Sequence, residues 1–148
     1  MNKLTLMAMI YILWAGEIIG LSFIATPAKF LASNFTIPEL LIIGNVTFHT
    51  QKWVEWGFLA VLLILNICHY RKNGINNNMA VLITIFCLFM IEYYYLMPIM
   101  DIRLSNVVNG INQPATNHHN VFVALEIIKI IILVVCSYKI IKNKSTNC

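Results

Sequence analysis

The residues best suited to chemistry lie inside the most apolar parts of the chain. The sequence has six acidic residues, and four of them fall one to each apolar run: Glu17, Glu55, Glu92 and Glu126. An ionisable group in hydrocarbon costs about 3 kcal/mol, so such groups usually face the interior of a helix bundle and pair there. Lys129 follows Glu126 by three residues, on a neighbouring face of the same predicted helix. These residues predict a buried polar cluster.

The four glutamates fall at related depths. In a four-span topology, one end of every run lies on the side of the chain termini. At 1.5 Å per residue, Glu17 and Glu92 lie about 20 Å from that end of their runs. Glu55 and Glu126 lie only about 3 and about 7 Å from the opposite end. Histidines and one aspartate fall at that same opposite end, so we predict one ligand or ion pocket there, with nine candidate residues: Glu17, His49, Glu55, Glu92, Asp101, His118, His119, Glu126 and Lys129.

Several chemistries fit such a set. Histidine and carboxylate ligands suit several transition metals, but the Glu-x-x-His spacing of di-iron bundles is absent from the sequence. A haem needs a histidine within a span as axial ligand, and no histidine lies deep in a run. A proton or cation path, the polar end of a lipid-like ligand pocket and purely structural bonds between helices remain open. No catalytic residue, metal or cofactor is assigned.

Composition places the chain in a membrane. Hydrophobic residues make up 59% of the 148 residues and charged residues 11%, against about 25% charged in soluble domains. The mean hydropathy is +0.77. The basic residues stand mostly near the ends of apolar runs, which is typical of membrane topology and not of a nucleic-acid surface. We expect the lipid bilayer as partner and no nucleic acid, in a homo-oligomer, a larger membrane complex or neither.

The apolar runs predict an all-α, polytopic membrane protein. Residues 1–148 form one domain, a bundle of four transmembrane helices with spans at about 4–26, 50–70, 79–100 and 120–141. Thr36 and Glu39 have capping-box spacing, which predicts an extra interfacial helical segment before the second span, with a bend near Gly44. Residues 101–120 are predicted as a loop that contains the turn signal Asn109-Gly110.

The Lys and Arg residues predict the orientation of the bundle. Six of them share one side of a four-span topology: Lys3, Arg71, Lys72, Lys139, Lys142 and Lys144. Three share the other side: Lys29, Lys52 and Arg103. Because basic residues concentrate on the cytoplasmic side, we predict that both termini are cytoplasmic.

Four short islands carry a family resemblance. They are Thr26-Pro27-Ala28-Lys29-Phe30, Gly44 to His49, Met97 to Arg103, and His118-His119 leading to Glu126 and Lys129. Their order resembles that in small, uncharacterised bacterial inner-membrane proteins, and is more distantly similar to the transmembrane-protein-205-like family. The resemblance implies four spans in a bacterial cytoplasmic membrane, recurrent polar residues on one side, and no assigned chemistry.

The functional hypotheses follow from the cluster. The first is an integral membrane protein with a small-ligand or ion site in the outer half of the bundle. The alternatives are a membrane-bound, metal-dependent enzyme or redox subunit that uses the same residues, and a structural or assembly subunit of a larger membrane complex. The sequence does not decide whether the protein is an enzyme.

Overall fold

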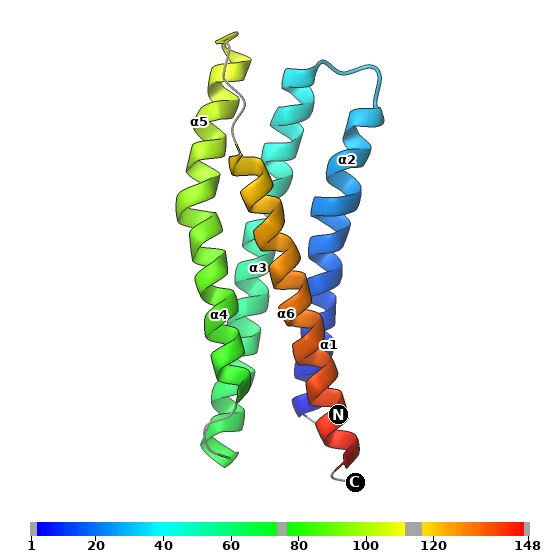
Figure 1. The fold of residues 1–148 in the computed structure, drawn as a ribbon, viewed down its shortest axis with the longest axis vertical. Coiled ribbons are helices and arrows are strands. Elements are labelled where there is room, and N and C mark those ends of the chain that lie inside the picture. Colours follow the sequence, from blue (N-terminus) through cyan, green and yellow to red (C-terminus); the bar gives the residue numbers. More distant parts are fainter. Residues whose placement is uncertain (1–2, 74–76, 112–116, 147–148) are drawn as a thin grey trace.

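The chain forms an up-and-down bundle of long helices with both termini at one end (Figure 1). The computed structural model describes residues 3–73, 77–111 and 117–146, and within these ranges it contains helices and turns and no strand. Four helices, Lys3–Leu31, Ile37–Cys68, Met79–Val108 and His118–Lys142, are long and apolar enough to cross a membrane. The prediction of an all-α chain with four such helices is confirmed.

The first and third long helices each contain a π-helical stretch just before a proline. In the first, α1 (Lys3–Ile18) continues through η1 (Ile19–Ala25), α2 (Thr26–Ala28) and η2 (Lys29–Leu31). In the third, α4 (Asn77–Ile91) continues through η3 (Glu92–Leu96) into α5 (Met97–Val108). Thr26 N–H donates to the Leu21 carbonyl, and Met97 N–H donates to the Glu92 carbonyl. Proline has no backbone N–H to donate, and the hydrogen bonds five residues apart before each proline accommodate this loss. Both helices therefore continue past the proline.

These continuous helices correct two predicted boundaries. The first helix does not end near Thr26-Pro27 but runs to Leu31. Residues 101–108 are the last turns of α5 and not a loop. The helix ends at Asn109, where Gly110 N–H donates to Val107 and Ile111 N–H donates to Asn106. Gly110 has φ +74°, the left-handed conformation that suits glycine after a helix. The turn predicted at Asn109-Gly110 is therefore confirmed.

The second long helix, α3 (Ile37–Asn73), is a single element. Its predicted capping interaction is present, because Thr36 N–H donates to Glu39 Oε2 at 2.7 Å. The residues predicted as a separate interfacial segment are its first turns, and the helix continues through Gly44 without a break. Gly44 is helical like its neighbours. The low helix propensity of one glycine does not end a long helix that is packed in a bundle.

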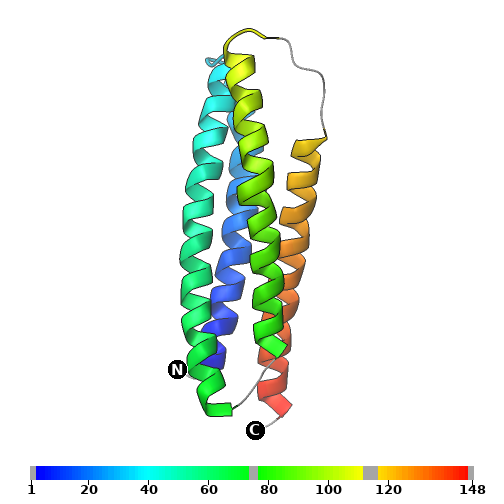
Figure 2. The ribbon, with the colours of Figure 1, turned by 90° about the vertical axis from the view of Figure 1, so that its left-hand side faces the viewer.

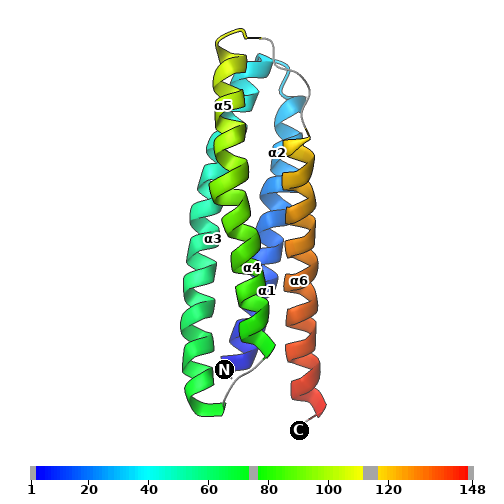
Figure 3. The same cartoon turned by 60° about the vertical axis from the view of Figure 1, so that its left-hand side comes forward.

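The helices surround one core, with the last helix, α6 (His118–Thr146), packed along α1 (Figures 2 and 3). α3 also packs against α1, α4 contacts α3 and α6, and η3 contacts α6. The apolar core fills the half of the bundle near the termini and includes Tyr11, Trp14, Leu62, Phe89 and Leu133. The buried charged residues lie beyond this core, toward the other end of the bundle.

Trp14 is the largest fully buried side chain of the core, with its ring stacked on Phe58 at a centroid distance of 5.7 Å. We expect Trp14→Ala to lower the free energy of unfolding in mixed micelles by about 3 kcal/mol or more, because a large cavity is left. Ile12→Ala, on the exposed face of the same helix, should change it by about 0.5 kcal/mol or less. Equal losses in the two variants would contradict this packing.

Candidate functional site

Five charged side chains meet in the interior of the bundle and form what we call the Lys/Glu cluster: Lys52, Glu55, Glu92, Glu126 and Lys129. Two helices supply a lysine and a glutamate three residues apart, which places both on one side of the helix. α3 carries Lys52 and Glu55, and α6 carries Glu126 and Lys129. The fifth member, Glu92, is the first residue of the π-helical stretch η3.

Each ammonium group of the cluster reaches all three carboxylates. Lys52 Nζ lies 2.6 Å from Glu55, 2.7 Å from Glu92 and 3.0 Å from Glu126. Lys129 Nζ lies 2.7, 2.6 and 3.2 Å from the same three residues. An ammonium group has three N–H donors and no acceptor. Lys52 Nζ donates to all three carboxylates, whereas Lys129 Nζ donates to Glu55 and Glu92 and forms an ion pair with Glu126. All five side chains are at most 1% exposed.

The three glutamates use their oxygens differently. Glu55 accepts from Lys52 with Oε1 and from Lys129 with Oε2. Glu126 accepts from Lys52 with Oε1, and its Oε2 lies 3.2 Å from Lys129 Nζ as an ion pair without a hydrogen bond. Glu92 accepts from both lysines with Oε2 alone, and its Oε1 is buried without a hydrogen-bond partner among the described residues. The cluster is therefore asymmetric at Glu92.

Polar and aromatic residues surround the cluster on the side away from the termini. Gln51 Nε2 donates to Glu126 Oε1 at 3.3 Å, and Ser22 Oγ donates to Gln51 Oε1 at 3.1 Å. The Phe122 ring lies 5.0 Å from Lys52 Nζ, a favourable distance for a cation above an aromatic face. Phe122 also packs edge-to-face on Phe48, with centroids 5.2 Å apart.

Glu17 completes the set of one glutamate from each helix. Both of its carboxyl oxygens are buried and lack a hydrogen-bond partner among the described residues. Lys52, Glu55, Glu126 and Lys129 lie close enough to act on it electrostatically. Glu17 therefore adjoins the Lys/Glu cluster without an ion pair to it.

The cluster has the carboxylates for a metal ion, but the two lysines already form ion pairs with each of them. Glu55, Glu92 and Glu126 each offer an oxygen, and these oxygens lie within 4.8 Å of one another. The two ammonium groups, however, already lie 2.6–3.2 Å from them. A metal would have to displace a buried lysine and leave its charge unpaired, which is costly. The arrangement therefore favours lysine, and not a metal, as the resident cation.

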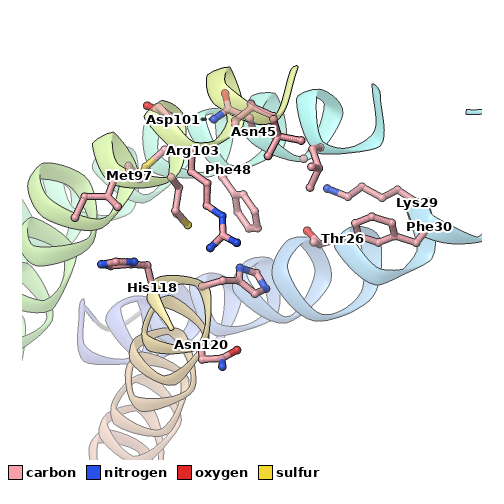
Figure 4. Close-up of a pocket in the computed structure, with 17 residues that line it drawn as sticks. Thr26, Lys29, Phe30, Asn45, Phe48, Met97, Asp101, Arg103, His118 and Asn120 are labelled. Carbon is pink, nitrogen blue, oxygen red and sulfur yellow. Dashed lines mark hydrogen bonds between the residues drawn. The ribbon is translucent and has the colours of Figure 1, made fainter. Parts of the chain in front are cut away.

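A pocket of about 490 Å³ opens at the end of the bundle away from the termini (Figure 4). α6 begins below the far ends of α3 and α5 (Figure 1), and the pocket lies over its first turn. The wall contains apolar residues from η2, α3 and α5: Phe30, Leu41, Phe48, Met97, Ile99, Met100, Leu104 and Val107. Polar residues share it: Thr26, Lys29, Asn45, Asp101, Arg103, His118, His119 and Asn120. We call this the end pocket.

The end pocket has two basic side chains against one carboxylate. Lys29 and Arg103 reach it from two different helices, and the imidazoles of His118 and His119 reach it from α6. Its acidic residue, Asp101, accepts from Asn45 Nδ2 and lies 3.1 Å from His49 Nε2, so its charge is already shared. The first-turn N–H groups of α6 add partial positive charge at the same place. His118 Nδ1 is buried without a hydrogen-bond partner among the described residues.

Gly44 makes room for one of these cations. A methyl group at Gly44 would lie 1.7 Å from Lys29 Nζ, so any side chain at position 44 has to push the ammonium away. The end of a lysine side chain is flexible, and it moves at little cost to the fold. Gly44 therefore sets the position of the Lys29 charge in the end pocket.

The structure divides the predicted site residues between these two places. Glu55, Glu92, Glu126 and Lys129 meet in the Lys/Glu cluster, with Glu17 beside it. Asp101, His118 and His119 line the end pocket, and His49 contacts it through Asp101. Glu126 is not among the pocket residues, because it follows His119 by seven residues, about 10 Å along α6.

Sequence reasoning missed Lys52 and Gln51. The orientation prediction treated Lys52 as a basic residue that flanks the second span. In the structure its side chain is 1% exposed and lies in the Lys/Glu cluster. The spacing Lys52 to Glu55 matches that of Glu126 to Lys129, and this repeated i, i+3 pairing was the available signal. Gln51 offers no comparable pattern.

Comparisons with protein-family models, with curated proteins and with solved structures find no match. The resemblance based on the four sequence islands therefore stays a prediction.

The asymmetry at Glu92 predicts unequal effects of two isosteric substitutions. Glu55→Gln points an amide NH₂ at an ammonium group, and we expect it to lower the free energy of unfolding by about 3 kcal/mol or more. Glu92→Gln retains one acceptor for both lysines and puts its NH₂ at the partnerless oxygen, so it should cost about 1 kcal/mol or less. Unfolding in mixed micelles followed by circular dichroism measures both. Equal costs, or the reverse order, would show that the oxygens are not used in this way.

Proposed function

We propose that the chain is an integral membrane protein that crosses a bilayer four times and binds a small amphipathic anion in the end pocket. Large apolar side chains on all four helices point away from the core, among them Leu13 and Ile64 at 61% exposure, Ile83 at 57% and Ile131 at 56%. A surface of this kind supports lipid contact. A bacterial cytoplasmic membrane is the location that the sequence resemblance favours.

The burial of Lys52 supports the proposed orientation. Because Lys52 lies inside the bundle, it does not count among the flanking basic residues. Lys29 and Arg103 then flank the pocket end, against six basic residues at the end with the termini. This larger asymmetry favours cytoplasmic termini and an end pocket on the outer side.

The observation that carries the ligand proposal is the composition of the end pocket. Its volume, about 490 Å³, is within the usual range for small-molecule sites, about 300–1,000 Å³. Lys29, Arg103 and the start of α6 suit a carboxylate or phosphate group. The aromatic and aliphatic wall suits an apolar body attached to that group. A headgroup of an anionic lipid and a free organic acid share this chemistry.

The metal-dependent alternative has less support, because ammonium groups already occupy the carboxylates of the Lys/Glu cluster. A role as a structural or assembly subunit is compatible with the fold. If the chain has this role, a partner protein should copurify with it. No feature of the described residues specifically favours that role over ligand binding.

Reporter fusions test the orientation. Fusions after Asn76 and at Cys148 should report a cytoplasmic location, and fusions at Ser33 and Asn112 should report the outside. The physical reason is the distribution of Lys and Arg at the two ends of the bundle. The opposite result at both loops would place the end pocket on the cytoplasmic side and refute the proposed orientation.

Ligand binding is tested with hexyl phosphate and the full chain in nanodiscs of a neutral lipid. We expect saturable binding by calorimetry, and a loss of about tenfold or more in Lys29→Ala, because a charged hydrogen bond is removed. Gly44→Ala should weaken binding without unfolding, since it only displaces Lys29. Gly57→Ala, on the same helix with no atom within 4 Å of the added methyl group, is the matched control.

Two further binding experiments identify the source of the anion and test the preference for negative charge. Competition by phosphatidylglycerol in the nanodisc would identify a lipid headgroup as the source of the anion, and its absence would favour a free organic acid. Hexyltrimethylammonium should not bind. Equal binding of this cation, or no effect of either Lys29→Ala or Gly44→Ala, would overturn the proposal.

A further inference from the structure

The Lys/Glu cluster and Glu17 carry more negative than positive charge. α1 supplies Glu17, α3 supplies Lys52 and Glu55, η3 supplies Glu92, and α6 supplies Glu126 and Lys129. With every group ionised, four carboxylates face two ammonium groups, an excess of two negative charges. Uncompensated charge in a low-dielectric interior is strongly unfavourable. A proton on a carboxyl removes one such charge and needs no cavity of its own.

The ion pairs and hydrogen bonds together distinguish two carboxyls for these protons. Every oxygen of Glu55 and Glu126 lies within 3.2 Å of a lysine nitrogen, although Glu126 Oε2 makes no hydrogen bond. Glu92 Oε1 has no hydrogen-bond partner among the described residues although the residue is 0% exposed, and both oxygens of Glu17 lack one as well. Glu17 and Glu92 are therefore the two carboxyls with a buried oxygen for which the described residues show neither a hydrogen bond nor an ion pair.

Polar side chains lie between this set and the end pocket. Thr26 lines the pocket, and Ser22 lies about one turn below it on the same helix. Ser22 Oγ donates to Gln51 Oε1, and Gln51 Nε2 donates to Glu126 Oε1. Elsewhere between the pocket and the cluster, the rings of Phe48 and Phe122 pack together. Ser22 and Gln51 therefore supply hydrogen-bonding groups on the pocket side of the cluster, beside an aromatic wall.

We propose that the Lys/Glu cluster and the adjoining Glu17 form a proton-exchange site, in which Glu17 and Glu92 hold protons that exchange with water in the end pocket through Ser22 and Gln51. Uptake forms an O–H bond on a carboxylate oxygen with a proton that hydronium gives up, and release reverses the step. The lysines remain charged throughout. The proposal does not depend on the anion proposed for the pocket.

Infrared spectroscopy of the full chain in lipid tests where the protons are. We expect the carbonyl-stretch band of protonated carboxylic acids at neutral pH, and a loss of about half of its intensity in Glu92→Gln and again in Glu17→Gln, since each removes one of two acids. A glutamine replaces a neutral acid isosterically, so both variants should fold. Glu39→Gln, which changes the exposed capping residue of α3, should leave the band unchanged.

The exchange route has its own test. The shift of the same band after transfer to D₂O should slow by about fivefold or more in Gln51→Leu, because the relay is interrupted. Thr50→Val, at the adjacent exposed position, should exchange as the unchanged chain does. Absence of the band from the unchanged chain, or a band that neither glutamine variant reduces, would overturn the proton assignment. Equal exchange in Gln51→Leu and Thr50→Val would overturn the route.

Discussion

Two buried ammonium groups, each held among the same three carboxylates, fix how the helices of this bundle align. Apolar packing is non-directional, and a helix that slides by one turn moves by 5.4 Å. Such a slip exchanges one apolar contact for another, but it breaks the bonds of 2.6–3.2 Å that join α3, η3 and α6. The Lys/Glu cluster therefore specifies the register, and the apolar core beneath it supplies packing.

The backbone irregularities and the end pocket follow from the same alignment. Pro98 requires a change in the helical bonds before it, and the resulting π-helical stretch begins at Glu92, the residue that faces both lysines. Because α6 is placed by Glu126 and Lys129, its first turn lies below the far ends of α3 and α5, and a pocket remains above it. The helix that completes the cluster thus also forms the floor of the positively charged pocket.

The sequence predicted the helices well, because apolar runs of about 20 residues and a capping box are local signals. It predicted that Glu92 and Glu126 would be interior, since isolated charges in apolar runs usually face the bundle interior. It placed Asp101 in a loop because the apolar run ends at Met100, and the π-helical bonds before Pro98 show how the helix continues past that proline. Lys52 was missed because a lysine at the edge of an apolar run usually reaches the interface, and three-dimensional neighbours alone show that it turns inward.

The ion pairs of the Lys/Glu cluster place specific nitrogen and carbon nuclei close together, which solid-state nuclear magnetic resonance in lipid bilayers measures. The chain would carry ¹⁵N at lysine Nζ and ¹³C at glutamate Cδ, and Lys52→Met and Lys129→Met would assign the two signals. We expect strong dipolar coupling of both ammonium nitrogens to several carboxyl carbons, because nitrogen and oxygen lie 2.6–3.2 Å apart. Two lysine signals without such coupling, exchanging freely with water, would contradict this expectation.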